Sequence, residues 1–180
     1  MSNSWFEVIN QSVLEQGDLI TDCKIFRPVH AESQKDDSVV TIAEEIHDVI
    51  ILTQTCDIEN RNVEEVLVAR VVTYGNLIAE FGGADIRRSR TYRKTALDNV
   101  IPAYLLLQER TIPPILEWSL VDFHNLFTIP RSLLSEITSG KGDRLRLVPP
   151  YKEHLAQSFA KYMMRVALPA TLDAFESFKP

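Results

Sequence analysis

Hydrophobic residues recur along the chain mostly in short runs separated by turn signals, which is the pattern of a β-rich domain. The run 49–55 contains almost no polar alternation, so a strand there is expected to be buried on both faces. The strands predicted from the runs cover residues 19–26, 38–42, 49–55, 66–73, 101–108, 115–123, 125–129 and 145–148.

Three helices are predicted around these strands. Ser4 can cap a short helix that carries Trp5 and Leu14 on its apolar face, and Pro130 begins a second helix that ends near Gly140. The clearest helix begins at Pro149-Pro150, where apolar side chains recur every three or four residues. The other segments are predicted as loops and turns, with one helical turn in the last of them: residues 27–37, 57–62 and 75–94.

These elements predict a single domain over residues 1–180, mainly β with added helices (α+β). We expect a twisted β-barrel or curled sheet with its core at about 16–148, and a C-terminal helix at about 150–167 packed on it. A chain of 180 residues is long enough for one such core. No internal repeat, low-complexity tract or linker divides it.

Composition narrows the class of protein. Hydrophobic residues make up 45% and charged residues 24%, which is typical of a soluble globular protein. No stretch approaches the roughly 18 apolar residues that a membrane helix needs. The N-terminal residues lack a secretory signal pattern. Two cysteines, Cys23 and Cys56, do not suggest a disulfide scaffold. We therefore expect a cytoplasmic protein with reduced thiols and no membrane contact.

Charge is distributed unevenly. Residues 1–60 carry twelve acids and three bases, a net of −9, whereas residues 61–180 carry sixteen bases and thirteen acids, a net of +3. Arginine suits phosphate groups and tyrosine can stack on a base, so a basic strip in the second part predicts contact with RNA or DNA. A solvated loop, or pairing with the acidic part within the chain or across a homodimer, is the alternative. The basic strip consists of Arg87, Arg88, Arg90, Tyr92, Arg93 and Lys94.

A second candidate site follows the apolar run 49–55, where Cys56, Asp57 and Glu59 arrive together. In an extended chain the two acids face one side, where they could hold a divalent cation with Asp48 as a third ligand. A nucleophilic cysteine would need a base, and His47, His124 and His154 are the candidates. The competing interpretation is structural: a buried cysteine at a strand end beside an Asx turn. No metal and no cofactor is predicted.

The stretches "QGDLITDCKI", "DVIILTQTCDI" and "VLVARVVT" resemble, in this order, the strands of the PemK/MazF-like family. The resemblance covers roughly residues 16–75. It implies an SH3-like barrel and metal-independent endoribonuclease activity of the kind found in toxin–antitoxin systems. Thr73 matches one functional position of the family, but its catalytic arginine has no counterpart in Ile46-His47-Asp48.

A second resemblance spans more of the chain. "LTQTCDIEN" and "RLRLVPPYKEHLAQSFAKYMMRVALP" are similar to a set of uncharacterised bacterial proteins of similar length, which implies a bacterial, cytoplasmic protein and no particular activity.

The function predicted from the sequence is a nucleic-acid-interacting β-barrel module. It would be a PemK/MazF-like endoribonuclease or a catalytically inactive relative. If it cleaves RNA, the predicted catalytic residues are Thr73, Arg87 and Arg88, with the arginines stabilising charge. The alternative is a non-enzymatic protein-interaction subunit that works with a larger bacterial enzyme through its acidic N-terminal surface.

Overall fold

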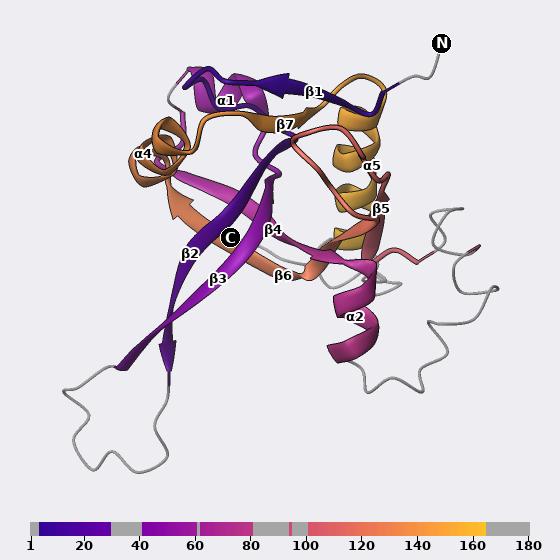
Figure 1. Cartoon of the computed structure of the whole chain (residues 1–180). Helices are drawn as coiled ribbons and strands as arrows, with labels where there is room; N and C mark the ends of the chain where they lie inside the picture. The colour runs from indigo at the N-terminus through magenta and orange to yellow at the C-terminus, as the bar shows by residue number, and fades with distance from the viewer. Residues whose placement is uncertain (1–3, 30–40, 61, 81–93, 95–100, 165–180) are drawn as a thin grey trace, which may run out of the picture.

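A computed structural model of the chain describes residues 4–29, 41–60, 62–80, 94 and 101–164 (Figure 1). Seven strands form one antiparallel sheet in the order β1-β7-β2-β3-β4-β6-β5. The mainly β architecture with added helices is therefore confirmed. The strands are β1 (Phe6–Ile9), β2 (Asp18–Val29), β3 (Thr41–Ile51), β4 (Glu65–Thr73), β5 (Tyr104–Leu107), β6 (Ser119–Pro130) and β7 (Arg144–Leu147).

The sheet is open. Among the described residues, strand pairing runs from β1 at one end to β5 at the other, and these two end strands do not pair with each other. The curled sheet expected from the sequence is thus present without the ring of pairings that closes a barrel. In Figure 1, β1 and β7 lie across the top of the molecule, and β2 and β3 run from there to the lower left.

Helices cover both faces of the sheet. Leu155 of the C-terminal helix packs in one cluster with Ile50 and Phe123, whereas Leu134 packs in another cluster that contains Val49 and Ile51. Consecutive residues of β3 therefore face opposite cores, which confirms burial on both faces for residues 49–51. The rest of the predicted run 49–55 is wrong, because β3 ends at Ile51 and Gln54 is exposed. The described helices are α1 (Thr55–Glu59), α2 (Tyr74–Glu80), α4 (Arg131–Lys141) and α5 (Tyr151–Met163).

Several predicted elements agree with the structure to within a few residues, and others are wrong. The predicted strands at 66–73, 101–108 and 145–148 correspond to β4, β5 and β7, and the predicted helices after Pro130 and Pro150 are α4 and α5. The predicted N-terminal helix is wrong: Phe6–Ile9 is a strand that pairs with β7. Stacking of Trp5 on Tyr151, with centroids 4.2 Å apart, helps hold this segment in place. Long-range pairing here overrides the local helical spacing.

Two pairs of predicted strands are in fact single long strands. The predicted strands at 38–42 and 49–55 overlap the two ends of β3, at residues 41–42 and 49–51, whereas residues 52–55 lie beyond it and residues 38–40 are outside the described residues. The predicted strands at 115–123 and 125–129 overlap β6 from Ser119 onwards, and residues 115–118 precede it. In both cases polar residues between the apolar runs look like a turn, but they lie within a paired strand. The predicted turn at 57–62 is also partly wrong, because α1 occupies Thr55–Glu59 and buries Ile58.

The outer part of the β2–β3 ribbon, from the Cys23–His47 pair to the Val29–Thr41 pair, is called the arm. In it, residues 23–29 of β2 pair with residues 41–47 of β3. A bulge at the base of the arm separates the Ile20–Val49 pair from the Cys23–His47 pair, and Asp22 there has a φ of 47°. The Asp22 amide donates to Asp48 Oδ1 at 2.9 Å, which holds the unusual backbone in place.

Candidate functional site at the β6 bulge

The β4–β6 ladder contains an interruption that gathers polar side chains. Ala69 pairs with Leu126, but the next residue, Arg70, pairs with Asp122. Residues 123–125 are therefore extra residues on β6. Bulges change the direction of side chains and occur often beside functional sites. Here the bulge brings the side chains of His124 and Asn125 to the carboxylate of Asp122.

Asp122 is buried and organises the bulge. Its carboxylate accepts hydrogen bonds from Asn125 Nδ2 at 2.7 Å and from the His124 amide at 3.0 Å. His124 Nδ1 lies 3.2 Å from Oδ1 of the same carboxylate, so Nε2 is the ring nitrogen that points away from it. The His124 side chain is 50% exposed. A buried carboxylate thus orients a solvent-accessible imidazole, an arrangement that suits a proton donor or acceptor.

Arg70 supplies a fixed positive charge beside this imidazole. Its guanidinium donates to both oxygens of Glu80, at 3.1 and 2.8 Å, and to Asp122 Oδ2 at 3.3 Å. Burial works against the charge, but the hydrogen bonds and charges of Glu80 and Asp122 outweigh it and raise the pKa of Arg70. Its Nε is buried and has no hydrogen-bond partner among the described residues. The cation is therefore permanent and incompletely satisfied.

Aromatic rings line the same site. Tyr104 of β5 and Tyr162 of α5 meet the His124 ring edge-on, with centroid distances of 5.5 and 5.8 Å. The site thus lies where α2, α5 and three strands meet, and its parts come from positions far apart in the chain. A guanidinium, an imidazole and neighbouring tyrosines form a set suited to a phosphate-bearing ligand.

A second arginine cluster lies at the other end of the sheet and is closed. Asp18 accepts hydrogen bonds from Arg144 Nε at 3.0 Å and from Arg146 Nη2 at 3.0 Å, and all three residues are buried. The two guanidiniums also donate to the carbonyls of Gln11 and Val13. Burial opposes the charge of Arg146, but Asp18 and Glu15 outweigh it and raise its pKa. This cluster ties β7 to the segment before β2.

A third group of polar side chains lies along the inner side of the arm. The ring of Phe127 stacks with His47 at 5.6 Å, and the Arg27 guanidinium lies 4.7 Å above it. A hydrogen bond from His47 lowers the pKa of Glu45, and the charges of Arg27 and Arg70 add to this effect. These contacts attach the arm to β6.

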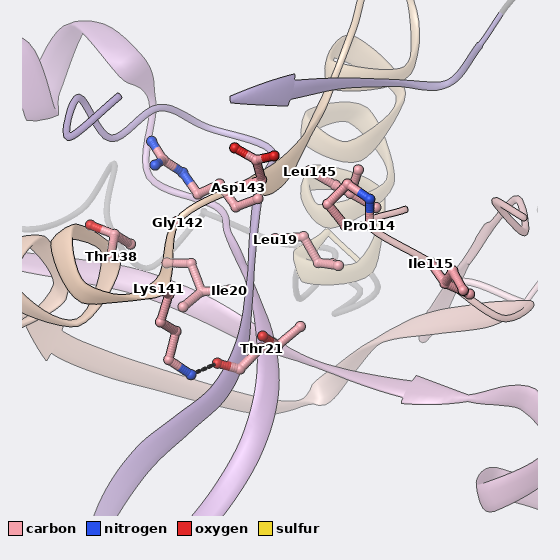
Figure 2. A pocket seen from close by; sticks show the side chains of 11 residues that line it. Leu19, Ile20, Thr21, Pro114, Ile115, Thr138, Lys141, Gly142, Asp143 and Leu145 are labelled. Atoms are coloured by element: carbon pink, nitrogen blue, oxygen red, sulfur yellow. Dashed lines mark hydrogen bonds between the residues drawn. The ribbon is translucent and has the colours of Figure 1, made fainter. Parts of the chain in front are cut away.

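A small cavity of about 90 Å³ lies between the end of α4, the start of β7 and β2 (Figure 2). Lys141 Nζ donates to the carbonyl of Thr21 at its edge, and Asp143 lies on the opposite side. Most of the other lining side chains are apolar, including Leu19, Ile115 and Leu145. The cavity adjoins the bulge of β2 at Thr21.

The predicted site residues meet different outcomes. Thr73 ends β4, and its Oγ1 accepts a hydrogen bond from the Asn76 amide at 3.2 Å, so it caps α2. Lys94 is exposed. The rest of the basic strip lies outside the described residues: Arg87, Arg88, Arg90, Tyr92 and Arg93.

The strand-end site of Cys56, Asp57 and Glu59 does not have the predicted geometry. The three residues lie on α1, where positions two apart point to different sides, so the two acids do not share one face. Cys56 is exposed rather than buried. In the described ranges no group of three potential ligands could hold a metal ion. Cys23 is the buried cysteine, and burial raises the pKa of its thiol although Lys141 partly opposes this.

Arg70, Asp122 and Asn125 were not singled out from the sequence, and His124 was considered only as a strand junction and as a base for Cys56. A signal was present: Asp122, His124 and Asn125 interrupt the otherwise apolar segment "LVDFHNLF".

Every described helix is too short or too polar to span a membrane. No protein-family model matches the chain and no curated protein matches it either, so what the site can do is argued from its chemistry.

Proposed function

We propose that the chain is a nucleic-acid-interacting module and that its β6 bulge contacts phosphate groups. One observation carries this proposal. The basic strip belongs to residues 81–100, and the described residues on both sides of that segment meet at the bulge. Glu80, the last residue of α2, binds Arg70, and Tyr104, the first residue of β5, pairs with Asp122. The described residues before and after this segment therefore contact Arg70 and Asp122, which belong to the bulge.

The chemistry of the described residues suits the same ligand. A phosphate oxygen accepts from a guanidinium and from a protonated imidazole, and both groups lie at the bulge. Tyr162 is partly exposed next to them and can contribute an apolar ring surface. Because Arg70 and His124 are already held by Asp122, these two side chains would lose little freedom on binding.

The paired acids of the N-terminal part also support the proposal. Asp18 and Glu15 are matched by Arg144, Arg146 and Lys152, with the Lys152 Nζ to Glu15 Oε2 distance at 2.9 Å. Part of the acidic surplus of residues 1–60 is thus neutralised inside the chain. The acidic surplus of residues 1–60 therefore repels an anionic ligand less than the net charge of −9 suggests.

In its finer form the proposal includes a relation to PemK/MazF-like, SH3-like barrels and cleavage of RNA without a metal. Thr73, Arg87 and Arg88 stay the predicted catalytic residues, and a catalytically inactive relative is the alternative. A protein-interaction subunit of a larger bacterial enzyme is the rival function. It predicts co-purification with a native partner and no affinity for RNA or DNA.

The experiment is a fluorescence anisotropy titration of labelled single-stranded RNA, and separately of DNA, at low and high salt with either EDTA or magnesium. Gels of the same samples report cleavage. For single strands the slope of log affinity against log salt is about −0.7 per phosphate contact. The variant Arg87→Ala/Arg88→Ala/Arg90→Ala should therefore bind more weakly and flatten this slope by about 2. His124→Ala should weaken binding several-fold.

A matched triple variant, Lys35→Ala/Lys161→Ala/Lys179→Ala, controls for the loss of three positive charges elsewhere in the sequence. It should keep most of the wild-type affinity. Cleavage in EDTA that the arginine variant loses would identify a metal-independent ribonuclease. Absence of binding to both nucleic acids at low salt, or an equal loss in both triple variants, would overturn the proposal.

A further inference from the structure

The outer face of the arm exposes an apolar cluster. Phe26, Ile42 and Ile46 are 55%, 63% and 59% exposed, and Pro28 beside them is exposed as well. Their strand positions place them on one face, because Phe26 pairs with Glu44, Pro28 with Ile42 and Lys24 with Ile46. Large contiguous exposed apolar surfaces mark interaction sites more often than isolated ones do.

The opposite face of the arm is packed, so the two faces differ. Cys23 and Ile25 are buried there against the cluster that includes Ile129, and Arg27 lies on Phe127. A two-stranded ribbon with only one packed face is marginally stable by itself. The outer face of this arm therefore has apolar surface to bury and no layer of the described fold above it.

We infer that this outer face is an interface with a second copy of the chain. Its two charged side chains, Lys24 and Glu44, pair with each other at 2.9 Å across the strands and leave the face with no net charge. A strongly charged partner would find nothing complementary on such a face. A two-fold axis instead brings Lys24 of each copy next to Glu44 of the other, so the face complements itself.

The anatomy of the face agrees with an interface between copies. Three large apolar side chains share this face, and the two charged side chains between them are already paired with each other, so that neither charge is left alone on burial. The arm is also held in one orientation at its base. Lys141 Nζ binds the carbonyls of Thr21 and Asp22, and Asp48 binds the Asp22 amide. Association then costs little ordering of the backbone.

One edge of the arm is available as well. Strand β2 pairs with β7 only at Asp18 and Leu19, so within the described ranges the stretch 23–29 has β3 on one side and no strand on the other. An edge of this kind is a ready site for contact with another chain. Contact through the outer face would place it near the second copy, and the interface could extend beyond the apolar cluster.

Sedimentation velocity over a range of protein concentrations tests the inference. The wild-type protein should pass from monomer to dimer as concentration rises. The variant Phe26→Glu/Ile46→Glu should weaken dimerisation at least roughly tenfold while circular dichroism and the melting temperature show an intact fold. The control Ile112→Glu/Ile115→Glu changes residues that are as exposed, at 68% and 69%, but lie outside the arm. It should dimerise like the wild type.

A charge exchange separates specific pairing from a general effect on solubility. Lys24→Glu alone should weaken the dimer because it places four acids together at the two-fold axis. Lys24→Glu combined with Glu44→Lys should restore it. A wild-type protein that is monomeric at every concentration would overturn the inference. A dimer that survives Phe26→Glu/Ile46→Glu, or that Ile112→Glu/Ile115→Glu disrupts equally, would overturn it too.

Discussion

Two clusters of the molecule use the same chemistry and differ in what they leave exposed. Each consists of a buried aspartate that accepts hydrogen bonds from arginine. Around Asp18, both Arg144 and Arg146 are buried, and they also donate to the Glu15 carboxylate and to the carbonyls of Gln11 and Val13. Around Asp122, the carboxylate is as well buried, but it also holds the half-exposed His124. Within the described part of the chain, Arg70 Nε there has no hydrogen-bond partner.

The difference separates a structural role from a binding role. A closed set of buried charges stabilises a fold only when every partner stays, and it offers nothing to a ligand. The open set around Asp122 also keeps its arginine largely buried, but it presents the half-exposed His124 ring, which a ligand can reach. The presence of a buried arginine–aspartate pair therefore does not identify a site. A binding site is indicated instead by a solvent-accessible side chain beside the pair, such as His124.

The largest expected effect belongs to Asp18→Asn. The substitution leaves two buried guanidiniums with a neutral partner, so the free energy of unfolding should fall by about 3 kcal/mol or more. Urea unfolding monitored by tryptophan fluorescence measures it. The exposed Asp143→Asn is the control and should stay within about 0.5 kcal/mol of the wild type. A loss for Asp18→Asn as small as the control's would show that the closed cluster is not structural.

Asp122→Asn should cost less, about 1–2 kcal/mol, because Arg70 retains both hydrogen bonds to Glu80 and is partly solvated. The same variant should weaken binding of RNA, since His124 loses the carboxylate that orients it. Urea unfolding and the anisotropy titration are run on one preparation. If Asp122→Asn destabilised the protein as much as Asp18→Asn and left binding unchanged, the bulge would be a structural cluster like the other.

The smallest effect concerns Glu45, whose pKa is lowered by the His47 hydrogen bond and by the charges of Arg27 and Arg70. Between this lowered value and the ordinary value of 4.5, the unfolded chain binds more protons than the native one. The contribution of Glu45 to stability is thus present above pH 4.5 and disappears as pH falls through the folded-state pKa.

Glu45→Gln should consequently be less stable than the wild type at neutral pH, and the two should converge in acid. Thermal melts of both proteins at a series of pH values measure the difference. A gap that persists unchanged at the acid end would show that Glu45 acts through packing rather than charge. The exposed Glu44→Gln offers a neighbouring carboxylate for comparison.

Prediction from sequence succeeded where structure follows from neighbouring residues. Strand β4 and helix α5 were predicted to within a few residues, because their apolar side chains recur at the period of the element itself. The N-terminal strand was missed because Phe6–Ile9 becomes a strand only by pairing with β7, about 140 positions along the chain. The break predicted between the strands at 115–123 and 125–129 is wrong, because a bulge within a paired strand looks locally like a turn.

The sequence by itself determined a mainly β domain with a C-terminal helix, the uneven charge and, for the first part of the run 49–55, burial on both faces. All of these depend on composition or on periodicity over a few residues. Only the tertiary structure decided which charges meet. Asp18 with Arg146 and Arg70 with Asp122 are pairs separated by 128 and 52 positions. The register of strands joins them, and register is an outcome of how the whole sheet packs rather than of any local pattern.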